Sequence, residues 1–109
     1  MLRNIFGALL IAALTLTATG CMSVPDPASI PQDTTVRELS QSGQAALDES
    51  NFKAAEVYYQ LIIDRYGSDP AARTAAEFEI AHMRLKQKKW ADARSRLETI
   101  IARYEEAGG

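Results

Sequence analysis

Apolar residues after position 35 recur at spacings of three and four, which is the period of an amphipathic helix. Short polar or glycine-containing breaks divide this part of the chain into four such stretches. The pattern therefore predicts four helices, over residues 35–49, 52–66 and 70–88, and from 90 to the glycine pair 108–109.

The predicted helix boundaries carry local signals. Thr35 and Glu38 have the spacing of a capping box, and Asp69 precedes Pro70, which suits the first position of a helix. Gly67 is expected to end the second helix in the left-handed conformation.

Each helix is expected to turn one apolar face inward. The predicted inward residues are Leu39, Gly43, Ala46 and Leu47 in the first helix; Phe52, Ala55, Tyr59, Ile62, Ile63 and Tyr66 in the second; Ala75, Phe78, Ala81 and Leu85 in the third; and Ala93, Leu97, Ile100, Ile101 and Tyr104 in the fourth.

The first twenty residues have the pattern of an export signal. Arg3 precedes an uncharged apolar run from 5 to 16, which is shorter than the roughly 20 residues that a spanning helix needs. Residues 18–21 (Ala-Thr-Gly-Cys) resemble a lipobox, which implies cleavage before Cys21 and lipid attachment to its sulfur. Residues 1–20 are therefore predicted to be a lipoprotein signal peptide.

Residues 21–34 are expected to link the lipid to the folded part. Three prolines exclude a regular helix here, so we expect a flexible tether, which could extend about 40 Å over residues 22–34. Met22 stands where an Asp typically signals inner-membrane retention, which favours the periplasmic face of the outer membrane.

The two halves of the helical part repeat each other. Residues 52–66 (FKAAEVYYQLIIDRY) align with 90–104 (WADARSRLETIIARY) at a shift of 38, and Gly43 then aligns with Ala81. A repeated helix pair predicts a short α-solenoid, with repeats at about 36–69 and 74–107 in a domain of residues 35–107.

The small residues at 43 and 81, with Ala55-x-x-x-Tyr59, resemble the tetratricopeptide repeat. Together with the lipobox, the prolines and the stretch DRYGSDPAARTAAEFEIA, the chain is similar to the BamD-like outer-membrane lipoproteins of the β-barrel assembly machinery. Similar repeats also occur in the periplasmic coordinator of the Tol-Pal system. The resemblance covers residues 36–104 and implies an all-α fold that binds proteins.

The chemistry-bearing residues are few. Cys21 is the expected lipid site and His82 is the chain's one histidine, so no metal or nucleophile constellation can be assembled. Glu77 and Glu79 are two residues apart, hence on different helix faces, and are interpreted as a solvated pair. We expect no enzyme activity, no metal and no cofactor besides the lipid on Cys21.

Charge and resemblance together indicate the class of partner. The predicted mature part has 11 basic residues, because Arg3 belongs to the signal, against 14 acidic ones, which gives no reason to expect nucleic acid. In tetratricopeptide repeats the first helix of each pair lines a peptide-binding groove. By registration the expected groove residues are Arg37, Ser40, Gln44, Asp48, Phe78, His82, Leu85 and Lys86.

Two repeats are fewer than the three that usually make a stable array. We therefore expect part of Ile100, Ile101 or Tyr104 to be uncovered, and to meet a second copy or another protein. The leading interpretation is a membrane-anchored envelope module that binds proteins, as an accessory to outer-membrane protein assembly. The alternative is a solute- or lipid-binding accessory of an envelope transport system.

Overall fold

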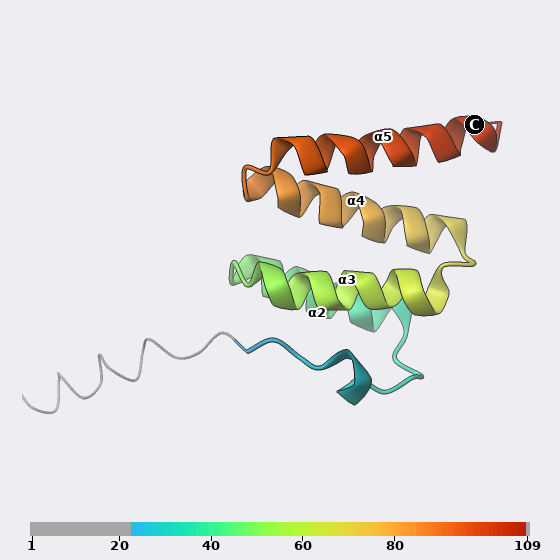
Figure 1. The fold of residues 1–109 in the computed structure, drawn as a ribbon. Coiled ribbons are helices and arrows are strands. Elements are labelled where there is room, and N and C mark those ends of the chain that lie inside the picture. The colour runs from blue at the N-terminus through green and yellow to red at the C-terminus, as the bar shows by residue number, and fades with distance from the viewer. Residues whose placement is uncertain (1–22, 109) are drawn as a thin grey trace, which may run out of the picture.

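The computed structural model describes residues 23–108 and confirms an all-helical chain (Figure 1). It consists of a short 3-10 helix and four α-helices, and this described part contains no strand. The elements are η1 (Pro27–Ser29), α2 (Val36–Asp48), α3 (Phe52–Tyr66), α4 (Pro70–Lys86) and α5 (Trp90–Glu106). The predicted signal peptide and Cys21 lie outside the described residues.

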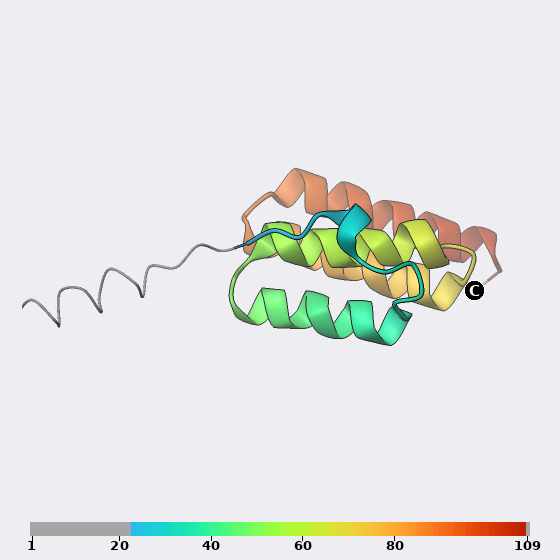
Figure 2. The same cartoon turned by 90° about the horizontal axis from the view of Figure 1, so that it is seen from below.

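The four α-helices are stacked as two antiparallel pairs. Each helix packs against the next along the chain, α2 on α3, α3 on α4 and α4 on α5. The α2–α3 and α4–α5 turns lie at one end of the stack, and the α3–α4 turn and the chain's C-terminus lie at the other (Figures 1 and 2). The predicted short helical solenoid is confirmed.

The predicted caps form at the first and third helices. The hydroxyl of Thr35 accepts a hydrogen bond from the Glu38 amide at 3.2 Å, and the Asp69 carboxylate accepts from the amide of Ala71 at 3.1 Å. Asn51 caps α3 by accepting from the Ala54 amide at 3.2 Å. These side chains satisfy amides that have no partner within the helix.

The turns inside the two pairs share one geometry, 38 residues apart. Ser50 and Lys88 both have positive φ, 57° and 61°. The following residues, Asn51 and Lys89, each donate to a carbonyl five residues back, at 2.8 Å in both cases. This is a Schellman end, and its repetition shows that the sequence repeat is a structural repeat.

The predicted left-handed conformation of Gly67 is wrong. Its φ is −65° and its ψ is −14°, which is right-handed. Glycine is nevertheless needed there, because a β-carbon would collide with the carbonyl oxygen of Ile63. The left-handed glycine lies instead after α5, where Gly108 has a φ of 79°.

The predicted inward faces are right for the first pair and partly wrong for the second. The buried residues of α2 are the four expected ones, and those of α3 include Ala55, Tyr59 and Ile62. In α4 the buried residues are Ala76, Ile80, Ala81 and Met83, so Ala81 is the one correct prediction. Ala75, Phe78 and Leu85 are exposed, as are Ile101 and Tyr104 of α5.

The physical reason is the position of each helix in the stack. Helix α3 has neighbours on several sides, whereas α5 packs mainly against α4. Only Ala93 of α5 is classed as buried among the described residues of that helix. A helix at the end of the stack has the same apolar sequence pattern as an inner helix, but no further helix packs on its outer face.

Residues 23–34 lie along α3 instead of extending as a free tether (Figure 2). Arg65 donates to the carbonyl oxygens of Pro31 and Ile30, both at 2.8 Å, and the Tyr66 hydroxyl donates to Thr34 at 2.6 Å. Ile30 packs against the core. The prolines do exclude a regular α-helix, but they do not prevent docking, so this segment covers one side of α3.

Candidate protein-binding surfaces

A surface groove lies between α2 and α4, where the sequence predicts one. Its cavity of about 340 Å³ is lined by Ser40 and Gln44 from α2 and by Glu79 from α4. Tyr59 of α3 also lines it, and small residues of α4 form the rest of that wall. The two helix pairs thus build one groove together.

Close packing of α2 on α3 forms the groove's floor. Gly43 is buried, and a β-carbon there would lie 2.8 Å from the ring atoms Cε2 and Cζ of Tyr59. The ring is 4% exposed. Burial, together with the nearby Glu79 and Asp48 carboxylates, raises the pKa of Tyr59 to about 12. The floor is therefore a neutral aromatic ring.

The predicted groove residues of α2 are brought together only in part. Ser40 and Gln44 line the cavity, whereas Arg37 and Asp48 are exposed near the two ends of the same helix. The side-chain amide of Gln44 donates to the Asp48 carboxylate at 3.1 Å. Asp48 therefore holds a cavity residue in place.

The predicted groove residues of α4 are all exposed but do not line the cavity. Phe78 is 52% exposed and Leu85 37% exposed, and His82 and Lys86 are also at the surface. The wall of the cavity is made instead by Ala72, Ala75, Ala76 and Glu79. A set of four exposed side chains thus continues beyond the cavity along α4.

Two residues of the groove were not predicted to be there. Tyr59 was expected to be core, and it is both core and floor. Glu79 was interpreted as solvated, but it is half-buried and faces the cavity. The 38-residue register gave no signal for Glu79, because its equivalent in α2, Gln41, was not a predicted groove residue either, although both line the cavity.

Glu77 is an ion-pairing residue and not a solvated one. Its side chain is 18% exposed and its two oxygens accept from Arg73 and Arg103, each at 2.7 Å. It lies on a different face from Glu79, as the spacing predicts. Glu77 therefore joins α4 to α5.

Arg84 joins the two helix pairs. Its guanidinium donates to Glu56 of α3 and, at 2.8 Å, to Asp92 of α5. The hydrogen bond with Glu56 raises the pKa of Arg84 above its usual value, and the hydrogen bond from Arg96 lowers the pKa of Asp92. Arg84 and Arg96 thus balance the negative charges of the Glu56 and Asp92 carboxylates.

A second hollow lies at the outer end of the stack, between the start of α4 and the end of α5. This cavity of about 620 Å³ is lined by Pro70 and Thr74 on one side and by Ile101 and Tyr104 on the other. Ile101 is 55% exposed and Tyr104 65% exposed. The prediction that this stripe is core is wrong for these two residues, and the prediction that part of it is uncovered is confirmed.

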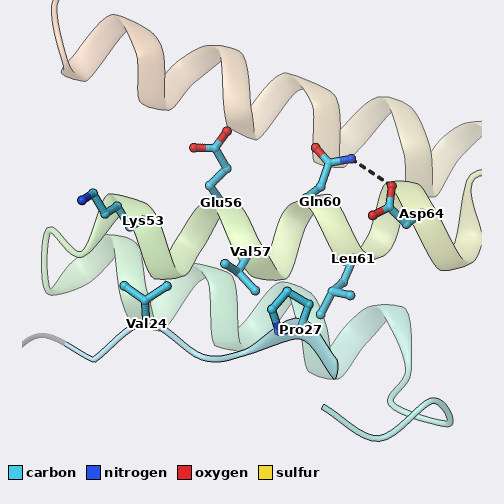
Figure 3. A pocket seen from close by; sticks show the side chains of 8 residues that line it. All are labelled: Val24, Pro27, Lys53, Glu56, Val57, Gln60, Leu61 and Asp64. Atoms are coloured by element: carbon cyan, nitrogen blue, oxygen red, sulfur yellow. Dashed lines mark hydrogen bonds between the residues drawn. The ribbon is translucent and has the colours of Figure 1, made fainter. Parts of the chain in front are cut away.

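A third hollow lies between part of residues 23–34 and α3 (Figure 3). Its volume is about 360 Å³, and Val24, Pro27, Val57 and Leu61 give it an apolar lining. Lys53, Glu56 and Gln60 stand along its rim on α3. It is a shallow surface hollow.

Two features of the described residues bear on chemistry and on membranes. From 23 to 108, no group of three His, Cys, Asp or Glu side chains could hold a metal ion. Among these same residues, no helix is long and apolar enough to cross a bilayer.

Comparison with known proteins gives one relative. No protein-family model matches the chain, and no solved structure matches it. An uncharacterized protein of Treponema pallidum (strain Nichols) is 40% identical over 88 residues, which are 81% of this chain and 35% of that protein. The chain therefore spans about a third of the length of the relative that it matches.

Proposed function

We propose that this chain is a lipid-anchored protein of the bacterial envelope that binds another protein through the groove between α2 and α4. The observation that carries the proposal is the composition of the groove. Side chains of both helix pairs line it, its floor is the neutral ring of Tyr59, and Ser40, Gln44 and Glu79 surround that floor with hydrogen-bonding groups. An aromatic floor with a polar rim suits a peptide or a helix of a partner.

The cellular setting rests on residues 1–21. The export signal and the lipobox-like residues 18–21 support lipid attachment at Cys21, and Met22 supports the periplasmic face of the outer membrane. The similarity to BamD-like lipoproteins makes components of outer-membrane protein assembly the first partners to test. A role as a solute-binding accessory is less well supported, because the hollows of the described part open at the surface.

Site-specific crosslinking in cells would test the groove. A photoreactive amino acid replaces Gln44 or His82, on the groove side of α2 and α4, in a protein carrying its own signal in a two-membrane host. The matched control position is Gln60, which is exposed on α3 beside the hollow of Figure 3. We expect adducts from positions 44 and 82 and none from 60.

Mass spectrometry of the adducts would identify the partner. Outer-membrane assembly components would support the proposed partner class, and adducts containing only this chain would point to self-association. Equal labelling from position 60, or none from positions 44 and 82, would refute the groove as the binding surface.

A further inference from the structure

The lysines of this chain are all gathered at one end of the stack. Lys53 lies in the first turn of α3, Lys86 ends α4, and Lys88 and Lys89 form the α4–α5 turn. All four side chains are exposed. The α2–α3 and α4–α5 turns lie at the same end of the stack (Figures 1 and 2). The four exposed lysines make this end a basic surface.

Two acidic residues near this end are already paired with arginine. Glu56 and Asp92 both accept from Arg84, and Asp92 also accepts from Arg96 at 3.1 Å. Asp48 and Glu49 at the end of α2 remain as counter-charges. The opposite end has more carboxylates than arginines: Asp33, Glu38, Asp64, Asp69, Glu77, Glu105 and Glu106 against Arg37, Arg65, Arg73 and Arg103.

Trp90 lies at the same basic end. It is the first residue of α5, directly after Lys88 and Lys89, and it is 61% exposed. Its counterpart in the first pair, Phe52, is half-buried and packs against the core. Packing within the described chain therefore does not account for the large apolar surface of Trp90.

The chain also leaves the folded part at this end. The side-chain amide of Asn51, in the α2–α3 turn, donates to the carbonyl oxygen of Ser23 at 2.9 Å. Two residues can span at most about 7 Å, so Cys21 is attached within that distance of Ser23. A lipid on Cys21 would bring the bilayer to this end of the stack.

We infer that the surface formed by Lys53, Lys86, Lys88, Lys89 and Trp90 rests on an anionic phospholipid bilayer. The inference rests on the lipid anchor of the proposed function and adds a defined orientation to it. Each lysine near an anionic surface strengthens attachment about fivefold. Tryptophan favours the headgroup level, because its ring is apolar while its N–H remains hydrogen-bonded.

Trp90 is the chain's one tryptophan, so its fluorescence reports on this surface directly. The mature lipidated protein, purified from membranes, is reconstituted into vesicles containing phosphatidylglycerol and a brominated phospholipid, or into phosphatidylcholine vesicles with the same brominated lipid. We expect a blue shift and quenching of Trp90 in the anionic vesicles, both weakened by salt because charges at this surface are screened.

Charge variants of the same protein test the role of the lysines. Lys88→Gln with Lys89→Gln should abolish most of the quenching in anionic vesicles. The matched control is Arg37→Gln with Arg73→Gln, which removes two charges from the first turns of α2 and α4 at the other end, and it should leave the quenching unchanged. Circular dichroism checks that both variants fold.

The outcomes separate this inference from the lipid anchor. Protein that floats with vesicles but shows an unquenched Trp90, or equal quenching in the lysine variant, would overturn the orientation and keep the anchor. Protein without lipid that still floats with anionic vesicles through its lysines would refute the anchor and support the surface. Protein that neither carries lipid nor floats would overturn both.

Discussion

We expect Gly43→Ala to destabilise this protein, although alanine is normally the better helix former. Gly43 lies in the interior of α2 and is buried. A β-carbon there would be 2.8 Å from two ring atoms of Tyr59, which is closer than real side-chain contacts. Because this ring is 4% exposed and packed in the core, it cannot move aside freely.

The size of the effect follows from two opposing terms. Replacing glycine by alanine inside a helix stabilises by about 0.5–1 kcal/mol. Overpacking a buried site costs about 1–3 kcal/mol. We therefore expect a net loss of about 0–2.5 kcal/mol, measured by urea denaturation followed by circular dichroism on the chain from residue 21 with Cys21→Ser.

The second helix pair suggests the control. At the equivalent positions it has Ala81 and Leu97, so a β-carbon in the first helix is matched by a smaller side chain in the second. In a Tyr59→Leu background, Gly43→Ala should thus stabilise by about 0.5–1 kcal/mol. An increase in stability from Gly43→Ala alone, or the same effect in both backgrounds, would refute the steric argument.

Two further predictions concern the docked segment and the groove floor. Arg65→Ala should release residues 23–34 from α3 and make them sensitive to protease. The control Arg94→Ala, which loses only a surface pair with Glu98, should not have this effect. Equal cleavage of the two variants in limited proteolysis with mass spectrometry would show that Arg65 does not hold the segment. Because the pKa of Tyr59 is raised from 10.0 to about 12, the unfolded chain loses this proton first, and stability should fall as the pH rises through that interval. Tyr59→Phe should remove this part of the pH dependence, and ultraviolet absorbance that shows all tyrosines ionising near pH 10 would contradict the burial argument.

The fold could be predicted because helix periodicity runs through all four helices and capping residues begin α2, α3 and α4. Thr35 and Asp69 cap as their positions indicate, and α3 begins and ends at the predicted residues, Phe52 and Tyr66. The exception is the left-handed turn. Ser50 and Lys88 adopt it without being glycine, because the backbone hydrogen bonds of the Schellman ends compensate for the strain.

The buried face of α4 could not be read from periodicity, because the helix carries two apolar stripes. Ala76, Ile80 and Met83 form one, and Phe78 and Leu85 belong to the other. Each stripe begins with an alanine, Ala76 or Ala75, and carries two large side chains, so side-chain size does not select one of them. Which stripe packs depends on how the two pairs are stacked, which is a tertiary property.

Docking of residues 23–34 was missed because proline indicates which regular structures a segment cannot form, and says nothing about its tertiary contacts. Proline lacks an N–H, so a segment with several prolines has more carbonyl acceptors than amide donors. The carbonyls of Pro27 and Pro31 each accept one local bond, from Ile30 and Thr34, and a carbonyl oxygen can accept a second. The planar guanidinium of Arg65 can collect such carbonyls from several residues at once, and here it binds those of Pro27, Ile30 and Pro31. The sequence does not distinguish Arg65 from its counterpart in the repeat, Arg103, which pairs with the Glu77 carboxylate instead.

The docked segment changes what the lipid anchor would do. A free tether would let the groove sample positions about 40 Å from the membrane, whereas docking leaves only Met22 between Cys21 and the segment fixed on α3. If the basic end rests on the bilayer, the helices point away from it, and α4, with 17 residues, reaches about 26 Å. The groove would then open sideways, parallel to the surface, and a partner would have to present its binding segment close to the same membrane.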